Sequence, residues 1–469
     1  MPLIIPSNSI SAGGYEVSYS TNLGDNAYYS RTPASASNRK TFTFSFWVKR
    51  SRLGYEQYLY CTSPSNAQTQ IIFSGQDYFG FDHYTTGYAT SVRSTQVFRD
   101  PSAWYHFMVA VDTTQVTASN RVKLYVNGSQ ITDLSASTYP SQDYQYSVNN
   151  TVVQNIGRWI PGPDNYYSGY FSEYCLIDGQ ALDPTSFGEF DADTGIWKPI
   201  DVSGLTFGTN GFYLDFATRA TDPIDASGNG NNWSSSNVLS TDWKTDTPTN
   251  NFATLNPLDN FYAQSTFSEG NLKVVTGTTQ YSSNTGTIGV STGKWYWEVE
   301  FDVDNAGNRV SHIGIKSQQD TSIDQGLGTK STDWGYRGFN GEYYNNATST
   351  AYGNTYVAGD IISIALDLDN NKLYFGKNGT WQNSGVPTSG ATGTGAISIT
   401  DPASTIFGFY VPALSYQDGS STGTFLANFG NPPFTIASGN SDANGYGNFE
   451  YAVPSGYYAL CTKNLAEFG

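Results

Sequence analysis

Side chains that could act as a nucleophile or a general base are scarce in this sequence of 469 residues. Nucleophilic catalysis needs a serine or a cysteine beside a base, which is usually a histidine. The chain has three histidines, and we expect each to pack or hydrogen-bond inside the fold: His83, His106 and His312. Residues 289–293 (GVSTG) have the letters of a nucleophile elbow, but that motif needs a helix after its turn, and a Trp-rich stretch follows here. We therefore interpret the motif as a turn.

Carboxylates offer a second route to chemistry, either as a glycosidase pair or as calcium ligands. A glycosidase needs two carboxylates that flank the scissile bond. Four acidic residues alternate along one predicted strand: Glu298, Glu300, Asp302 and Asp304. Calcium needs several converging oxygens, and two pairs of residues offer some: Asp77 with Asp82, and Asp164 with Asn165. Because the sequence has no D-x-[DN]-x-[DN]-G loop, we predict no cofactor and name no ligand set for a structural calcium ion.

Aromatic side chains in three predicted loops are the remaining candidates for a binding site. In these loops Gly, Asn and Thr surround the rings, which could stack on sugar rings or anchor a protein partner. The candidate glycan- or partner-binding residues are His83, Tyr84, Tyr166, Tyr167, Trp334, Tyr336, Tyr343 and Tyr344. Tyr88 lies in the same loop as His83 and Tyr84. The alternative interpretation is that the rings fold back over the edge of their own domain.

The elements that must position these residues are strands and turns. Aromatic residues make up 15% of the chain and charged residues only 13%, a composition typical of strands rather than helices. Forty acidic residues against 23 basic ones give a net charge of −17, which argues against a nucleic-acid partner and against an anionic membrane surface. No apolar run approaches the roughly 20 residues that span a membrane, so we predict no membrane insertion.

Cysteine usage and the N-terminus indicate where the chain is made. The three cysteines are too few for a disulfide framework and are expected to be buried free thiols: Cys61, Cys175 and Cys461. The first residues lack the basic and apolar regions of a signal peptide. We therefore expect assembly in a reducing host cytoplasm.

Alternation of apolar and polar residues marks the clearest strands. Residues 41–50 (TFTFSFWVKR) place Phe and Val on one face, and residues 104–112 (WYHFMVAVD) are apolar on both faces, as a central strand should be. Residues 359–381 (GDIISIALDLDNNKLYFGKNGTW) read as two strands with a DNN turn between them and an Asn-Gly turn after them. The chain therefore reads as a series of antiparallel strands.

Five blocks of the first half resemble, in order, the concanavalin-A-like, laminin-G-like family. They are FSFWVKR (44–50), WYHFMVAVD (104–112), VKLYVNG (122–128), NIGRW (155–159) and YFSEYCLIDGQAL (170–182). The resemblance implies a two-sheet, jelly-roll-type β-sandwich, whose curved face often binds sugars.

Three blocks of the second half resemble the SPRY family of β-sandwiches. They are GKWYWEVEF (293–301), the stretch 359–381 and FLANFGNPPF (425–434). The resemblance implies a recognition module without catalytic residues. It also implies that the strand with the alternating acids buries Trp297, Val299 and Phe301 and turns its acids outward, which argues against a glycosidase pair.

We therefore predict an all-β chain of two tandem antiparallel β-sandwiches. Residues 1–224 would form the concanavalin-A-like sandwich, residues 225–250 a linker rich in Gly, Asn and Ser, and residues 251–469 the SPRY-like sandwich.

Three further segments resemble a group of marine bacteriophage proteins that are generally described as virion or tail-fibre-like. They are SGNGNNW (227–233), DTPTNNFATLNP (246–257) and GYYALCTKNL (456–465). The resemblance implies a location on the virion, at its surface or on a tail appendage, with other virion proteins as partners and a homo-oligomeric state.

The resulting hypothesis is a non-enzymatic tail fibre or similar appendage that binds a host-surface glycan or protein during adsorption. Two alternatives remain open. One is a capsid decoration or fibre subunit with purely structural protein contacts, and the other is a polysaccharide-cleaving glycosidase.

Overall fold

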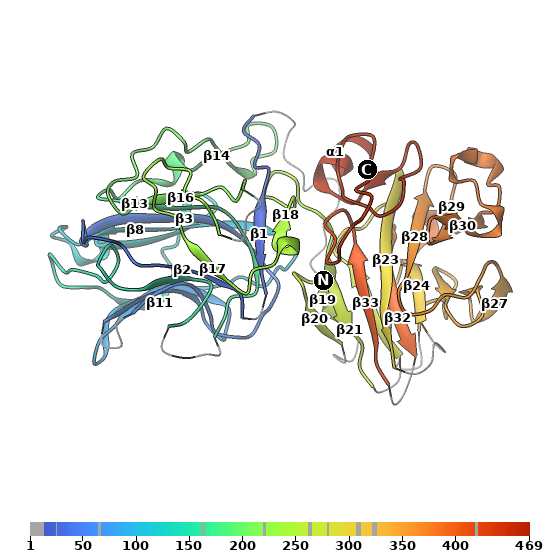
Figure 1. Ribbon diagram of the computed structural model, residues 1–469, viewed down its shortest axis with the longest axis horizontal. Coiled ribbons are helices and arrows are strands. Elements are labelled where there is room, and N and C mark those ends of the chain that lie inside the picture. Colours follow the sequence, from blue (N-terminus) through green and yellow to red (C-terminus); the bar gives the residue numbers. More distant parts are fainter. Residues whose placement is uncertain are drawn as a thin grey trace. The chain divides into compact units, whose positions relative to one another are not determined.

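The computed structural model describes residues 14–24, 26–63, 67–160, 162, 165–218, 222–260, 265–278, 281–305, 311–320, 326–417 and 421–469. The chain folds into two compact units, and the boundary between them falls between Thr249 and Asn250 (Figure 1). Each unit has a hydrophobic core of its own.

The first sheet of the N-terminal unit has the strand order β10-β9-β8-β3-β13-β1-β18, and β16 pairs with β13. Its strands are β1 (Ser20–Leu23), β3 (Thr41–Arg50), β8 (Trp104–Asp112), β9 (Val122–Val126), β10 (Ser129–Gln130), β13 (Gly169–Asp178), β16 (Phe212–Leu214) and β18 (Trp243–Lys244). In Figure 1 the long strands β8, β3 and β13 lie side by side.

The second sheet of this unit has the order β11-β7-β6-β5-β4-β12-β2-β17. Its strands are β2 (Tyr28–Arg31), β4 (Gln57–Thr62), β5 (Gln68–Phe73), β6 (Tyr78–Tyr84), β7 (Tyr88–Val97), β11 (Leu134–Thr138), β12 (Gln154–Ile156) and β17 (Ser234–Ser236). The short pair β14 (Gly188–Phe190) and β15 (Trp197–Pro199) and the 3-10 turns η2 (Ala118–Asn120), η3 (Pro184–Ser186) and η4 (Ser240–Asp242) complete the unit.

The core of the N-terminal unit follows from the alternation along its strands. Phe42, Phe44, Phe46 and Val48 of β3 all enter the main core, together with Phe and Val side chains of β5, β6 and β8. The other face of this sheet is buried as well, because the chain after β13 returns over it and forms smaller apolar clusters with side chains of β3, β8, β9 and β13. The first sheet is therefore covered on both faces, and the predicted central strand β8 lies inside it.

The predicted linker is wrong for residues 225–249, which belong to the N-terminal unit. Trp233 is buried and its ring lies 5.0 Å from that of Phe212. Strand β17 pairs with β2, and β18 pairs with β1. Polar side chains hold the irregular stretch before β17, since the Asn229 amide donates to the carbonyls of Gly208 and Gly211. Composition indicated a flexible segment, but these contacts fix it to the sheets.

The first sheet of the C-terminal unit has the order β19-β22-β32-β24-β25-β26-β27. Its strands are β19 (Leu255–Asn260), β22 (Tyr281–Gly286), β24 (Ser311–Lys316), β25 (Asp333–Arg337), β26 (Glu342–Asn345), β27 (Thr348–Ala351) and β32 (Val411–Gln417).

The second sheet of the C-terminal unit has the order β20-β21-β33-β23-β28-β29-β30, with β31 on β29 and β34 on β23. Its strands are β20 (Thr266–Ser268), β21 (Lys273–Val275), β23 (Lys294–Asp304), β28 (Asp360–Asp367), β29 (Lys372–Lys377), β30 (Thr380–Trp381), β31 (Ile397–Ser398), β33 (Gly423–Asn428) and β34 (Tyr458–Ala459). Strands β33, β23, β28 and β29 are seen side by side in Figure 1. Three 3-10 turns lie between β30 and β32 in the chain: η6 (Gln382–Ser384), η7 (Pro387–Thr392) and η8 (Pro402–Ser404). The helix α1 (Thr462–Phe468) comes after β34.

The expectation that the acids of β23 face outward is wrong for Glu298, whereas Glu300, Asp302 and Asp304 are partly exposed. Trp297, Val299 and Phe301 enter the core as predicted. Glu298 on the opposite face is fully buried, because the chain near the C-terminus covers it. Its carboxylate accepts hydrogen bonds from the backbone N–H groups of Glu450 and Tyr451, so it fastens this covering segment to the sheet.

The described residues contain no helix long and apolar enough to cross a bilayer. The cysteines are buried free thiols, which confirms that prediction: Cys61, Cys175 and Cys461.

Candidate functional site

The second sheet of the N-terminal unit presents one face to the core and another away from it, and we call the latter the outer face. Strand register groups its side chains into three rows. The rows are Tyr58–Ile72–Gly80–Arg93, Cys61–Gln70–Asp82–Ser91 and Gln68–Tyr84–Tyr88. Neighbouring strands therefore bring apolar, charged, amide and aromatic groups together on one surface.

The exposed part of the outer face is the turn between β6 and β7. Tyr84 is 40% exposed and Tyr88 is 52% exposed, and their rings meet edge to face at 5.4 Å. The Arg93 side chain lies next to them, with its guanidinium 5.4 Å from the Tyr88 ring and a hydrogen bond of 3.2 Å to the Tyr88 hydroxyl. We call Tyr84, Tyr88 and Arg93 the tip cluster.

Asp82 holds the guanidinium of the tip cluster in place. Arg93 Nε donates to both carboxylate oxygens of Asp82, at 3.2 and 3.1 Å, and Nη2 donates to Oδ2 at 2.7 Å. Burial raises the pKa of Asp82, and the bonds from Arg93 offset only part of this effect. Gly80 provides the space for the Arg93 side chain, because a Cβ at position 80 would lie 2.8 Å from Arg93 Cγ. The arginine is thus ordered before any ligand arrives.

The other end of the outer face is apolar. Tyr58, Cys61 and Ile72 form a buried cluster there, on which Trp159 and Ile160 pack. The rings of Tyr58 and Trp159 stack at 5.8 Å. Trp159 and Ile160 therefore cover this end of the outer face.

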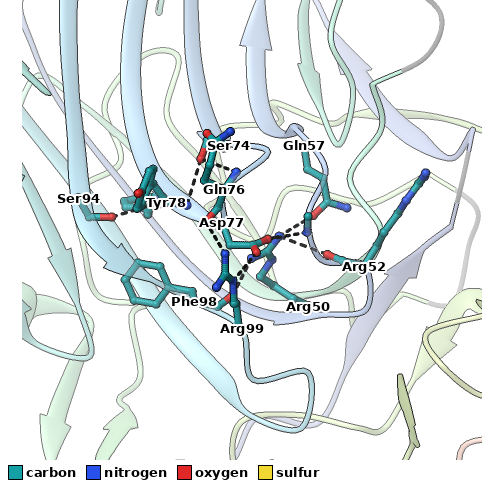
Figure 2. Close-up of polar contacts among 12 residues, drawn as sticks. Arg50, Arg52, Gln57, Ser74, Gln76, Asp77, Tyr78, Ser94, Phe98 and Arg99 are labelled. Carbon is teal, nitrogen blue, oxygen red and sulfur yellow. Dashed lines mark hydrogen bonds and ion pairs between the residues drawn. The ribbon is translucent and has the colours of Figure 1, made fainter. Parts of the chain in front are cut away.

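A buried charge network fixes the end of the β5–β6 hairpin opposite the tip cluster (Figure 2). Asp77 has a φ of +69° in the tight turn and accepts hydrogen bonds from Arg50 at 2.9 Å and from Arg99 at 2.8 Å. Burial alone would raise the pKa of Asp77, but the backbone N–H of Gly54 and the two guanidinium groups outweigh it and hold the pKa below its usual value. Arg50 also donates to the carbonyl of Phe98 at 2.6 Å.

The same contacts argue against one predicted pair of calcium ligands, Asp77 with Asp82. The carboxylate of Asp77 is taken by two arginines and that of Asp82 by Arg93, so the cation that each needs is already supplied by the chain. Asp164 lies outside the described residues. Among the residues that are described, no group of three or more His, Cys, Asp and Glu side chains could hold a metal ion.

Four of the predicted site residues are buried and cannot present a ring to a ligand, and three of these lie on strands rather than in loops. Trp334 and Tyr336 belong to strand β25 and enter the core, where Tyr336 stacks on Phe375 at 5.2 Å. Tyr167 is fully buried, and its hydroxyl donates to the carbonyl of Lys49 at 3.1 Å. His83 is buried too and shares a hydrogen bond of 2.8 Å with Thr69.

The other four predicted residues are partly or well exposed. Tyr84 lies in the tip cluster. Tyr343 and Tyr344 are half-buried on β26, where Arg337 lies over the Tyr344 ring at 3.9 Å. Tyr166 is half-buried beside Tyr28, with the ring centroids 6.2 Å apart. These rings lie in separate parts of two units, and Tyr84 is the most exposed of the four.

Sequence reasoning missed Arg93, the charged member of the tip cluster. Asp82 stood out as an acid, and Tyr88 lay in a predicted loop, but nothing pointed to Arg93. The signal that could have found it is register, because a short turn after Tyr84 folds β7 back on β6 and sets Arg93 opposite Gly80.

The histidines offer little support for acid–base catalysis. Burial lowers the pKa of His83 to about 4, and that of His106 and of His312 to about 3, so each is neutral at physiological pH. His106 Nε2 shares a hydrogen bond with Ser45 at 2.8 Å, but both side chains are buried and have no access to a substrate.

Comparison with known families assigns both units. A model of the concanavalin A-like lectin/glucanases superfamily matches residues 23–185, and a model of the SPRY domain matches residues 294–400. The chain thus carries a concanavalin A-like domain followed by a SPRY domain, in nearly all-β form, and the prediction of tandem β-sandwiches is confirmed. The three rows of the outer face and the tip cluster lie within the first match.

Solved structures with similarity to this chain include a SPRY domain, a pentraxin and a bacterial protein. The human HERC1 SPRY domain is 16% identical, with 37% of this chain and 93% of that one covered, at a TM-score of 0.27. A SAP-like pentraxin from Limulus polyphemus is 13% identical, with 36% and 80% covered, at a TM-score of 0.28. A proposed carbohydrate binding protein from Bacteroides ovatus is 16% identical, with 49% and 60% covered, at a TM-score of 0.35.

Proposed function

We propose that this protein is a non-enzymatic bacteriophage virion protein, on a tail fibre or similar appendage, that binds a glycan of the host surface during adsorption. The glycan would bind at the tip cluster on the outer face. The observation that carries the binding proposal is the pair of exposed rings, Tyr84 and Tyr88, beside the pre-ordered Arg93 in a region that matches a lectin superfamily.

The chemistry of the tip cluster suits a carbohydrate. Aromatic faces pack against the C–H faces of sugar rings, while a guanidinium donates several hydrogen bonds to hydroxyl or carboxylate oxygens. Arg93 is bound to Asp82 and to the Tyr88 hydroxyl, so little side-chain entropy is lost when a ligand binds. The surface is open and small, and a single contact of this kind is weak. Several copies on one appendage would raise the effective concentration.

The location on a virion rests on the resemblance of residues 227–233, 246–257 and 456–465 to phage proteins. Its partners would then be other virion proteins and identical subunits. Non-enzymatic action is consistent with the three buried neutral histidines and with Glu298, whose carboxylate is covered by the chain's own backbone.

The test replaces both rings of the tip cluster. Tyr84→Ser with Tyr88→Ser should weaken binding to the purified surface polysaccharide of marine bacteria roughly ten-fold or more, because two aromatic contacts are lost. The melting temperature should stay nearly constant, since both side chains are exposed.

A matched control removes two exposed rings elsewhere. Phe190 and Phe339 are 56% and 49% exposed, so Phe190→Ser with Phe339→Ser should leave polysaccharide binding unchanged. Equal binding by the tip variant and the native protein would reject the tip cluster as the glycan site. Binding of the native protein to emptied phage capsids, but to no polysaccharide, would support a decoration protein instead. Release of reducing sugar would contradict non-enzymatic action.

A further inference from the structure

We propose that the first sheet of the N-terminal unit carries a second binding site, a pocket for a single neutral or amino sugar. This pocket has a volume of about 200 Å³ and lies beside β8 and β9, against the segment that follows β13. Its wall includes Ala110, Asp112, Asn120, Lys123, Tyr125 and Asp183. We call it the Ala110 pocket.

Ala110 makes the pocket. Register sets it opposite Lys123, while its neighbour Met108 lies opposite Tyr125. Long side chains thus surround a single methyl group on this face of the sheet. Segment 181–183 forms another wall. A larger residue at position 110 would fill the space.

Four polar side chains line the pocket, of which Asn120 and Asp183 are exposed, Lys123 is half-buried and Tyr125 is buried. Lys123, Asn120, Tyr125 and Asp183 form no side-chain hydrogen bond or ion pair among the described residues. Tyr125 is only 7% exposed, and both its burial and the Asp183 carboxylate raise its pKa, so its hydroxyl stays protonated. The Tyr125 side chain is mostly buried, and its hydroxyl, which has no hydrogen-bond partner among the described residues, is a group that a ligand in the pocket can satisfy.

Asp112 behaves differently from these four groups. Its carboxylate accepts hydrogen bonds from the Thr114 hydroxyl at 2.6 Å and from the Gln115 amide at 2.5 Å. Because its oxygens already accept these hydrogen bonds, Asp112 adds negative charge to the wall but offers a ligand little further accepting capacity.

The free groups define the ligand. Lys123 donates three hydrogen bonds, Asp183 accepts, and Asn120 and Tyr125 do both, which matches the mixed donors and acceptors of sugar hydroxyls. Lys123 and Asp183 cancel in charge, and Asp112 leaves the wall negative, so a uronic acid is disfavoured. The volume lies below the roughly 300–1,000 Å³ of pockets for drug-sized ligands, and it suits one ring rather than a chain.

The test is saturation-transfer NMR on the full-length protein with glucose, galactose, mannose, glucosamine and glucuronate. It is run in the variant Tyr84→Ser with Tyr88→Ser, so that the tip cluster cannot contribute. We expect transfer to at least one neutral hexose or to glucosamine, and an affinity about ten-fold lower for glucuronate. Absence of transfer to every sugar overturns the proposal, whatever the fate of the tip cluster.

Two further substitutions locate the signal. Ala110→Leu should abolish transfer at an unchanged melting temperature, because its side chain enters the pocket. Lys123→Met should weaken binding about ten-fold through loss of a charged hydrogen bond, and it serves if Ala110→Leu fails to fold. Unchanged transfer in Lys123→Met or in folded Ala110→Leu overturns the proposal. Polysaccharide binding at an intact tip cluster should not respond to either, so the two sites can fail separately.

Discussion

Glu173 shows how burial changes a residue's chemistry in this protein. It lies at a bulge in β13 with a φ of +49°, and it is 6% exposed. Its carboxyl accepts hydrogen bonds from the hydroxyls of Tyr213 at 2.7 Å and Tyr15 at 3.1 Å. Burial raises its pKa to about 7 in spite of these bonds. The folded protein therefore holds a proton at Glu173 at pH values where the unfolded chain has released it.

Stability should accordingly fall as the pH rises from that of an ordinary glutamate to about 7. The contribution of Glu173 is complete below the unfolded pKa and lost above the folded one, which amounts to on the order of 3 kcal/mol of unfolding free energy. Glu173→Gln keeps an oxygen for both tyrosines and does not titrate, so it should flatten this part of the profile. Urea denaturation at about pH 4 and about pH 8 measures the effect. Equal pH dependence in both proteins would contradict it.

The same pKa argument applies to Asp333, whose buried carboxyl has a pKa raised by burial to about 7. It titrates in both proteins of that comparison, so only the difference between their profiles reports on Glu173.

At the scale of elements, the segment that leads out of the N-terminal unit is held by one buried ion pair. Lys49 of β3 lies 2.7 Å from Asp246, and both side chains are 1% exposed. Trp104 of β8 donates its indole N–H to the other oxygen of Asp246 at 2.9 Å. Two strands of the first sheet thus fasten the segment after β18.

Lys49→Met should cost on the order of 3–5 kcal/mol of unfolding free energy, because it leaves the Asp246 carboxylate buried without its cation. The double variant Lys49→Met with Asp246→Leu should recover part of that loss, since no uncompensated charge remains. Guanidinium denaturation measures both. A double variant that is less stable than Lys49→Met would contradict this account.

How far the sequence predicted the elements depended on the kind of residue that holds them. Strands β3, β23 and β28 followed from alternation, because burial of one face gives the sequence a period of two, and β8 followed from an apolar run on both faces. The segment 225–249 did not, because long-range hydrogen bonds from side chains such as Asn229 fix it, and these leave no period.

The candidate site was predicted only in part for a related reason. Trp334 and Tyr336 lie among Gly and Asn, which suggested a loop. They are alternate residues of β25, and both point into the core of the C-terminal unit. Tyr84 was found because it sits at a real turn. Arg93 and the Ala110 pocket depend on which strands become neighbours, and a single sequence does not show that pairing.

At the scale of the whole molecule, the net charge of −17 surrounds every binding site with a negative field. Surface polysaccharides of bacteria are often acidic, so a long-range repulsion opposes the local attraction of Arg93. The range of that repulsion falls from about 30 Å at 0.01 M salt to about 10 Å at 0.1 M salt.

Binding to an acidic polysaccharide should therefore strengthen as sodium chloride is raised from about 0.01 M to about 0.1 M. Binding of a neutral hexose at the Ala110 pocket should change little over the same range, which makes it the internal control. Titration at several salt concentrations measures both. Acidic polysaccharide binding that weakens with salt would mean that local attraction, rather than net charge, governs the encounter.

The buried thiols carry a consequence for life outside the cell. Burial raises the pKa of Cys61 and of Cys461 to about 12, and that of Cys175 well above its usual value. Thiolate is the species that reacts with oxidants, and here it is both scarce and shielded. At the virion location proposed above, these three side chains would therefore not respond to a change from a reducing cell to an oxidising medium.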